Sequence, residues 1–583
     1  MKRYACYFLF ILCILTIPAA LAYQNLDLLQ HVMAHWTGES DLKEQIKGTL
    51  ALAYLRLTRF PPQTAPFTPM RHTGLSPYGV NTFLEQEADP LKVEQSLQLI
   101  ADAGFHWIRQ EFPWEDIEIS AKGDFWDHKW NVSAWEKYDR IVALAEAHGL
   151  EIIARLDNPP AWSRSVGNAE GWSMAPPDRY EDFGDFVYAV VSRYRGRIRY
   201  YQIWNEPNIY PEWGDQPADP AAYVELLRMA YRRAKEADPN AVIIAAGLAQ
   251  TTEETPSEFG PRNMSDLLYL EKMYQAGVRG FFDIMGCQLY GLWTGPYDRR
   301  VSRDRTNFSR VELLREIMVR YGDADKPIWA TEVGWNAIPQ DSPAPPIYGR
   351  VSEETQAVYA IEAYRRAARE WPWMGVMNYW FFRRPSDAER DQAWYYFRLL
   401  EPDFTPLPVY DALAWLANEP PTMHIGYHQE DHWALNYVGD WRRIEDERAV
   451  LGAYALGHEG DRLTFYMEGT DLALVLRDAQ HIKALRTRID GRMVSPRLSW
   501  SAPSGVSIEQ GSFVAILARG LADARHRVEL EVVSGAIALD GILVWRTQPA
   551  WGLAVFVAFA LGAAIVRIAR AAASMSQEER KLS

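Results

Sequence analysis

Cysteine is scarce in this chain of 583 residues, which contains only three. Cys6 and Cys13 lie in an apolar leader, so a mature chain without that leader keeps only Cys287. A single cysteine excludes an intrachain disulfide, and packed cores must therefore hold the fold together. No histidine lies close to Cys287 in sequence, so we expect a small buried core residue there rather than a nucleophile.

Basic stripes, phosphate-binding loops and metal-binding clusters are also missing from the sequence. The formal net charge is -15, from 61 Lys and Arg against 76 Asp and Glu. This balance excludes a general nucleic-acid-binding protein, which would need a basic surface. Because neither a Gly-rich phosphate loop nor a metal-ligand spacing occurs, we predict no cofactor and no metal.

Long apolar runs are confined to the two ends of the chain. Met1-Lys2-Arg3, an apolar run over residues 4–18 and then Ala20-Leu21-Ala22 have the three parts of a secretory signal. We predict a signal peptide over residues 1–22, cleaved after Ala22 because of its small-residue ending. An uncleaved anchor helix is the alternative.

The second apolar run covers residues 550–566, which carry no charge and are followed by Arg567 and Arg570. This length is at the lower limit for crossing a bilayer, and Trp551 suits a membrane interface. The sequence predicts a transmembrane helix over residues 549–570 and a cytoplasmic tail over residues 571–583, with a buried core helix as the alternative. By the positive-inside rule the rest of the mature chain is extracytoplasmic and membrane-anchored.

Between the ends, a helical segment and linker (residues 23–70) precede short apolar runs that alternate with amphipathic stretches. This alternation is typical of repeated βα units. Eight strands are predicted, at residues 74–80, 106–112, 151–157, 198–206, 241–248, 281–290, 327–333 and 374–382. They indicate an α/β fold, a (β/α)8 TIM barrel over residues 71–420. A doubly wound open sheet is the alternative, but it normally has fewer strands and a Gly-rich first turn.

Two of these strands end in a glutamate. Glu206 follows the fourth strand, after Asn205 and before Pro207, and Glu332 ends the seventh in Thr331-Glu332-Val333-Gly334. A single carboxylate at a strand end is commonly a helix N-cap or a surface charge. Two of them on one barrel rim, in a chain with 23 Trp, favour the paired-carboxylate chemistry that cleaves a glycosidic bond.

These motifs resemble those of clan A glycoside hydrolases, most nearly families 39 and 5. In those families Asn-Glu-Pro carries the acid/base and Thr-Glu-x-Gly the nucleophile, so the resemblance implies these roles for Glu206 and Glu332. It also implies a retaining double displacement. The chain departs from the family pattern at Gln288, two residues before Tyr290, where histidine is usual; glutamine hydrogen-bonds but does not titrate.

Further polar and aromatic residues crowd the predicted strand ends, and each alone could be structural. We expect Asn205 to donate to the sugar 2-hydroxyl, and Arg109 and Tyr290 to hold Glu332 ionised. Burial and the charge of Glu332 should raise the pKa of Glu206. The other predicted substrate-binding residues are Asn158 and Gln288, with Trp162, Trp335 and Trp380 as stacking platforms.

After the barrel, short alternating strands separated by turns predict an all-β sandwich, jelly-roll-like, over residues 421–548. Its Gly-Thr-Asp and Ile-Asp-Gly turns and the stretch from Gly520 to Val528 resemble galactose-binding-like domains. The resemblance implies sugar binding, while a rigid spacer above the membrane is the alternative.

The sequence therefore predicts a membrane-anchored, extracytoplasmic retaining β-glycosidase. Its partners would be a carbohydrate substrate, most simply an envelope polysaccharide, and the membrane through the C-terminal helix. A scavenger of small β-glycosides is an alternative within the same class. A catalytically silent carbohydrate-binding protein of the cell envelope is the alternative from another class. Oligomeric state, sugar identity, and endo or exo action are not encoded in any motif.

Overall fold

The computed structural model describes residues 26–253, 262–499 and 512–547. The predicted signal peptide, transmembrane helix and tail lie outside these ranges. Within them, no helix combines the length and apolar character that a membrane span requires. The described residues form two compact units, one from residues 26–61 with 294–302 and the other from residues 62–293 with 303–546.

The smaller unit is built on helices α2 (Leu26–Thr37) and α3 (Leu42–Thr58). Asp41 caps α3 by accepting hydrogen bonds from the backbone N–H groups of Lys43 and Glu44. The segment 294–302 joins this unit through Arg300, whose guanidinium donates to the Thr37 carbonyl and to Glu39, each at 2.7 Å.

The larger unit begins with eight parallel strands that close into a barrel in the order β1-β10-β9-β8-β7-β6-β5-β2. The strands are β1 (Tyr78–Thr82), β2 (Trp107–Glu111), β5 (Glu151–Leu156), β6 (Tyr200–Ile203), β7 (Val242–Leu248), β8 (Ile284–Tyr290), β9 (Ile328–Gly334) and β10 (Met374–Tyr379). The predicted (β/α)8 barrel is confirmed, and closure excludes the open sheet. Strand β1 starts four residues later than predicted, because Pro77 has no N–H to donate to a neighbouring strand.

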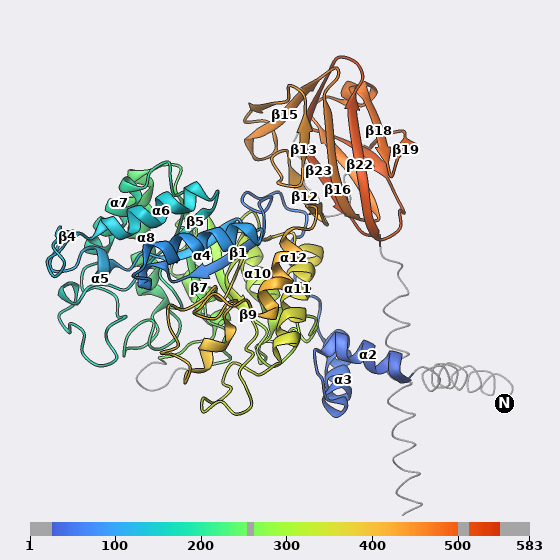
Figure 1. Ribbon diagram of the computed structural model, residues 1–583. Helices are drawn as coiled ribbons and strands as arrows, with labels where there is room; N and C mark the ends of the chain where they lie inside the picture. The colour runs from blue at the N-terminus through green and yellow to red at the C-terminus, as the bar shows by residue number, and fades with distance from the viewer. Residues whose placement is uncertain (1–25, 254–261, 500–511, 548–583) are drawn as a thin grey trace, which may run out of the picture. The chain divides into compact units, whose positions relative to one another are not determined.

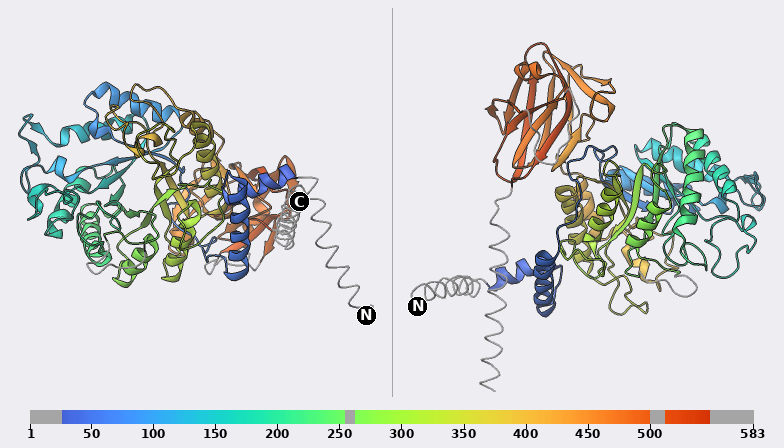
Figure 2. Two further views of the ribbon diagram at one scale, coloured as in Figure 1. Left: turned by 90° about the horizontal axis from the view of Figure 1, so that it is seen from below. Right: turned by 180° about the vertical axis from the view of Figure 1, so that it is seen from behind.

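Helices follow the strands and form an outer layer around them (Figures 1 and 2). They are α4 (Pro90–Asp102), α6 (Trp135–Ala147), α7 (Tyr180–Arg193), α8 (Pro220–Ala237), α9 (Asp266–Gln275), α10 (Val311–Arg320), α11 (Glu353–Glu370) and α12 (Pro408–Ala417). The β2–α6 connection adds the short helix α5 (Trp114–Ile117) and a hairpin of β3 (Trp126–Asp127) with β4 (Val132–Ser133). Asp219 and Pro220 show how the sequence starts a helix: the Asp side chain accepts from two N–H groups of α8, and Pro occupies its first turn.

The barrel interior changes from apolar to polar along the strands. Its floor is aromatic: the ring of Trp329 lies 5.0 Å from Tyr200 and 5.4 Å from Trp107. Two residues beyond Trp107 and Tyr200, the inward side chains are the buried polar residues Arg109 and Gln202. Because successive inward side chains are two residues apart, the next residues reach the carboxyl ends of the strands, where the candidate site begins.

A two-sheet β domain follows the barrel. One sheet has the order β11-β16-β22-β18-β19 with β13 beside β16, and the other β14-β15-β23-β17-β21-β20 with β12 beside β23. The bounds are β11 (Thr422–Met423), β12 (Gly426–Gln429), β13 (Asn436–Val438), β14 (Arg442–Glu445), β15 (Ala453–His458), β16 (Arg462–Gly469), β17 (Asp471–Leu476), β18 (Leu485–Ile489), β19 (Arg492–Val494), β20 (Arg497–Ser499), β21 (Phe513–Ala518), β22 (Ala524–Val532) and β23 (Ala536–Trp545).

Leu463 and Phe465 of one sheet share a core with Leu474 and Ile542 of the other, so the domain is a β-sandwich. The pairs are antiparallel except for the short β11, which runs parallel to β16. The predicted architecture is confirmed, while its resemblance to galactose-binding-like domains stays a prediction.

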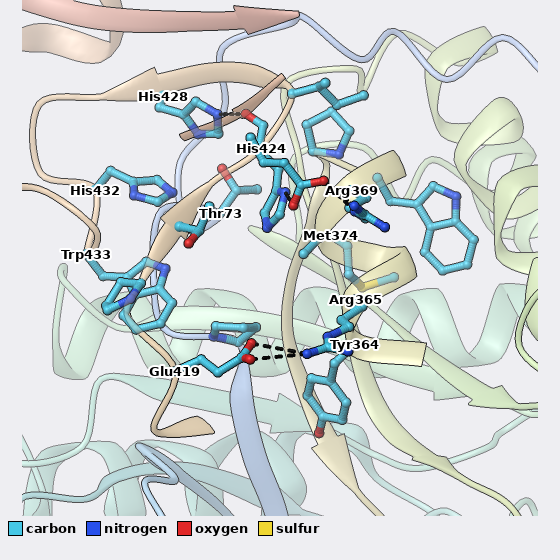
Figure 3. Close-up of a pocket in the computed structure, with 18 of the residues that line it drawn as sticks. Thr73, Tyr364, Arg365, Arg369, Met374, Glu419, His424, His428, His432 and Trp433 are labelled. Atoms are coloured by element: carbon cyan, nitrogen blue, oxygen red, sulfur yellow. Dashed lines mark hydrogen bonds and ion pairs between the residues drawn. The ribbon is translucent and has the colours of Figure 1, made fainter. Parts of the chain in front are cut away.

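A cavity of about 460 Å³ lies at the amino ends of the barrel strands, opposite the end that carries Glu206 and Glu332. It is lined by residues before β1 and β10, by α11, and by the first residues of the β domain (Figure 3). His424, His428 and His432 face it, and the His428 Nε2 lies 2.7 Å from the His424 carbonyl oxygen. Arg365 and Arg369 also line it, but they are paired with Glu419 and Glu468 respectively.

Burial keeps these histidines neutral, lowering the pKa of His424 and of His428 to about 4. An unfolded histidine titrates near 6.5, so between about pH 6.5 and 4 the unfolded chain binds more protons than the folded chain. The free energy of unfolding should therefore fall as the pH falls through this range. The effect is on the order of 2 kcal/mol per histidine between pH 6.5 and 4.5.

Urea denaturation of His428→Gln tests this expectation. Glutamine can still donate to the His424 carbonyl but does not titrate, so the variant should lose about 2 kcal/mol less stability over the acid range. His128→Gln is the matched control, because His128 is an exposed histidine paired with Asp124. Equal acid sensitivity of His428→Gln and the unsubstituted protein would contradict the burial argument.

Candidate active site

The two glutamates lie on the same rim of the barrel, at the carboxyl ends of its fourth and seventh strands. Strand β6 ends at Ile203, earlier than predicted, because Trp204 turns the backbone into the left-handed region with φ of 70°. Glu206 is also left-handed, with φ of 39°, and its N–H donates to the Gly247 carbonyl at 3.1 Å. This corner directs the chain off the strand, while Glu332 stays within β9.

Glu332 is held by two donors. Arg109 Nη1 donates to one carboxylate oxygen at 3.1 Å, and the Tyr290 hydroxyl donates to the other at 2.5 Å. The side chains of Arg109 and Glu332 are 2% and 7% exposed, so water weakens this ion pair little. Both contacts expected from the sequence are present, and together they fix the orientation of the Glu332 carboxylate.

Arg109 is the hub of a buried network. Its Nε donates to Gln202 at 2.7 Å, its Nη1 also donates to Asn81 at 2.6 Å, and its Nη2 donates to Asn205 at 2.9 Å. Asn81 was not predicted from the sequence, where it is an ordinary residue of the first strand. The guanidinium thereby bridges Asn205 and Glu332.

Glu206 has a different environment. Burial raises the pKa of its carboxyl well above the ordinary range, and the negative charges of Glu332 and Glu212 raise it further. Arg155 and a hydrogen bond from Gln288 act in the opposite direction. The surroundings of Glu206 therefore favour its protonated form, while those of Glu332 supply a cation and a hydroxyl donor.

Gln288 stands where the family pattern has histidine, and it is buried. Its amide contacts Glu206, its Nε2 lies 3.5 Å from Asn205 Oδ1, and its Oε1 accepts from Thr331 at 2.9 Å. The substitution thus keeps a hydrogen bond to Glu206 without adding a titratable group.

The remaining predicted residues are more scattered. Asn158 donates to Glu111 at 2.6 Å, and Trp162 donates to the Glu118 carbonyl at 2.9 Å. Trp380 is half-buried and packs edge-on against Phe83, with ring centroids 5.5 Å apart. Trp162 and Trp380 therefore keep partly exposed rings.

Trp335 does not suit the role of a stacking platform predicted for it. Its side chain is 0% exposed and packs between Phe308 and Tyr359, each 5.6 Å away. A Cβ atom at Gly291 would lie only 2.0 Å from the indole, so the ring fills the space beside β8. Burial by residues distant in sequence places this ring in the core.

Glu212 belongs to the site although sequence reasoning missed it. It lies in the loop between β6 and α8, its carboxyl accepts a hydrogen bond from the Asn205 side chain, and its pKa is raised to about 7, chiefly by burial. Its backbone carbonyl accepts from the Trp204 indole at 2.8 Å. No periodic pattern marks a loop residue, so only its position six residues after Glu206 could have drawn attention to it.

Part of the chain is similar to known carbohydrate-active enzymes. Residues 69–336 match the family model for cellulase, glycosyl hydrolase family 5, a range that contains both glutamates. A family 39 glycoside hydrolase from the gut symbiont Bacteroides cellulosilyticus WH2 aligns at 19% identity and a TM-score of 0.44, over 80% of this chain and 81% of that one. A monomeric beta-xylosidase from Caulobacter crescentus CB15 aligns at 15% identity and a TM-score of 0.42, over 81% of this chain and 98% of that one.

A curated relative, the chloroplastic beta-glucosidase-like SFR2 of Oryza sativa subsp. japonica, is 30% identical over 111 residues. That stretch covers 18% of this chain and 15% of the relative's length.

Residues 69–336 are thus similar to the glycosyl hydrolases of family 5, and two carboxyls on one barrel rim are the groups that cleavage of an O-glycosidic bond uses. The matched range covers less than half of the chain. Its family-model match spans the first seven barrel strands.

Arg109→Met should show how strongly the site depends on the network. The variant leaves Glu332 as a buried charge without its cation and leaves Asn81, Gln202 and Asn205 without a donor. We expect the free energy of unfolding to fall by about 3–5 kcal/mol.

Arg109→Met should also lower the turnover of an aryl glycoside. Arg109→Lys is the control, since it restores the charge but not the planar fork, and it should recover stability more than activity. Urea denaturation and steady-state kinetics measure the two effects. Normal stability of Arg109→Met would show that the network does not hold the rim.

Proposed function

We propose that the protein is a membrane-anchored, extracytoplasmic retaining β-glycosidase that acts on a polysaccharide or oligosaccharide. The observation that carries this proposal is the contrast between the two carboxyls on one rim. Glu206 is protonated by its surroundings, whereas Glu332 is ion-paired with Arg109 and hydrogen-bonded by Tyr290. A retaining mechanism requires one acid and one nucleophile in these states.

In the first step Glu332 attacks the anomeric carbon, while Glu206 donates its proton to the departing glycosidic oxygen. The bond from the anomeric carbon to that oxygen breaks, and a glycosyl ester of Glu332 forms. The negative charge of Glu332 is then lost to the new bond, which removes one cause of the raised pKa of Glu206. Glu206, now ionised, is thus suited to act as a base.

In the second step Glu206 takes a proton from water, and the water oxygen attacks the anomeric carbon of the ester. Glu332 leaves as a carboxylate, so the sugar is released with its original configuration after two inversions. Arg109 and Tyr290 stabilise the returning negative charge on Glu332. Asn205, fixed by Arg109, is placed to address the 2-hydroxyl of the sugar.

Anchoring at the envelope rests on the two terminal apolar runs of the sequence. An enzyme tethered outside the membrane is suited to polymers that cannot enter the cell, which favours a polysaccharide over a small glycoside. The β-sandwich then either binds sugar or separates the barrel from the bilayer. A silent carbohydrate-binding protein is the less favoured function, because binding alone does not require one protonated and one ionised glutamate.

Hydrolysis of a panel of aryl β-glycosides tests the assignment of the two glutamates. Glu332→Gln should abolish turnover, and Glu206→Gln should lower kcat/KM by about 10²–10⁴ on substrates with poor leaving groups. Glu225→Gln is a suitable control, since Glu225 is exposed on α8 and pairs with Arg228.

Azide should rescue Glu332→Gly and give a glycosyl azide of inverted configuration, which identifies the nucleophile. Full turnover by either glutamine variant would refute the mechanism and support a different catalytic pair.

Membrane attachment has its own test. The full chain expressed with its leader should partition with membranes and resist extraction by high salt, whereas a chain ending at residue 548 should be released into the soluble extracytoplasmic fraction. Replacing Leu553, Val555 and Phe556 by Asp should act like the truncation. Recovery of the full chain in the soluble fraction would disprove the anchor without affecting the enzymatic assignment.

A further inference from the structure

A second group of carboxyls lies beside the catalytic pair and is not used by the mechanism above. Glu111 ends β2, Asp157 follows β5, and Glu212 lies in the loop after β6. They surround Arg155, which is ion-paired with Asp157 and lies 3.4 Å from Glu111. The charge of Glu212 also acts on this guanidinium. We refer to Glu111, Asp157 and Glu212 as the acidic triad.

The hydrogen bonds of the acidic triad are not all satisfied by the protein. Among the described residues Arg155 is the cation in salt-bridge contact with the triad, while the charge of Arg109 also acts on Asp157 and Glu111. The Asp157 side chain is 3% exposed. Asp157 Oδ2 accepts from Arg155, but the buried Oδ1 has no hydrogen-bond partner. A buried carboxylate oxygen without a donor is costly. Burial, and to a lesser extent the negative charge of Asp157, raises the pKa of Glu111 to about 8 and that of Glu212 to about 7. At least one buried acceptor of the triad thus lacks a donor.

Glu212 connects the triad to the reacting centre. Arg109 Nη2 donates to Asn205 Oδ1, so the amide nitrogen of Asn205 is the group left to donate to Glu212. Asn205 is also the residue placed to address the substituent on C2 of the sugar. A carboxyl that contacts Asn205 therefore lies next to that substituent, and its charge reaches both Glu206 and Glu332.

We propose that the acidic triad is a subsite for an ammonium group, and that the enzyme cleaves a glycan in which the sugar next to the scissile bond carries a free 2-amino group. This inference rests on the proposed function and names its substrate class. The ligand chemistry is a hexosamine without its acetyl group.

Charge and hydrogen bonding both favour this substrate. An ammonium has three N–H donors, and hydrogen bonds between ionised partners are about twice as strong as neutral ones. A 2-hydroxyl brings one donor and no charge, and a 2-acetamido group brings a bulky neutral amide. A uronic acid would instead bring a further negative charge into a site that is already acidic, so we expect acidic sugars to be poor substrates.

Kinetics with the full chain at pH 6 test the proposal. The substrates are aryl β-glycosides of glucosamine and galactosamine, each compared with the 2-hydroxy and 2-acetamido sugars and with the glucuronide. We expect kcat/KM for the 2-amino sugar to exceed that for its 2-hydroxy counterpart at least tenfold, with no turnover of the glucuronide.

Glu212→Gln should reduce this preference by about 10- to 100-fold, because it removes the carboxyl that ionises beside the bound ammonium group. Asp157→Asn should reduce it as well. Glu115→Gln is the matched control: Glu115 is an exposed glutamate on the same rim, and its substitution should not change the ratio between the two substrates.

The kinetics separate the ammonium subsite from the hydrolytic activity itself. Efficient hydrolysis of 2-hydroxy glycosides with no preference for 2-amino sugars, or a preference unchanged in Glu212→Gln, overturns the ammonium subsite and leaves the glycosidase intact. If no aryl glycoside is hydrolysed, titration calorimetry can compare the affinities of the full chain for a glucosamine tetramer and a glucose tetramer. Tenfold tighter binding of the glucosamine tetramer, lost in Glu212→Gln, supports the subsite, and equal binding overturns it.

Discussion

The rim depends on one buried guanidinium. Arg109 holds side chains from the first, fourth and seventh barrel strands, with Asn205 and Glu332 on either side of it. A cation removed from water in this way is stable only beside an ionised partner and a full set of acceptors. The same contact that stabilises the barrel interior therefore also holds the Glu332 carboxylate in a fixed orientation beside a cation.

The two catalytic candidates differ through their surroundings rather than through their own chemistry. Both are glutamates at strand ends, yet Glu332 has two donors, while Glu206 has a neutral amide from Gln288 and two nearby negative charges. A histidine at position 288 could itself become charged and favour ionisation of Glu206. Glutamine keeps the hydrogen bond without that charge, which preserves the contrast in protonation that a double displacement needs.

The layers of side chains inside the barrel help to give the two glutamates different surroundings. The aromatic floor of Trp107, Tyr200 and Trp329 excludes water from below, so the polar layer above it has a low local dielectric. Arg109 and Glu332 lie on rigid strands, so their side chains have little conformational freedom. Loops contribute the residues that distinguish substrates, and Glu212 illustrates this division, since it reaches Asn205 from the connection between β6 and α8.

The sequence by itself determined the barrel, the sandwich and the positions of Glu206 and Glu332 at strand ends, because alternation with period two is written locally along each strand. It also indicated the pairing of Arg109 and Tyr290 with Glu332, since polar residues at the carboxyl ends of the strands collect on one rim of a barrel. Only the tertiary structure decided that Trp335 is buried, that Asn158 contacts Glu111, and that Glu212 joins the site. Those outcomes depend on loop paths and on packing partners far away in the chain, which no local pattern encodes.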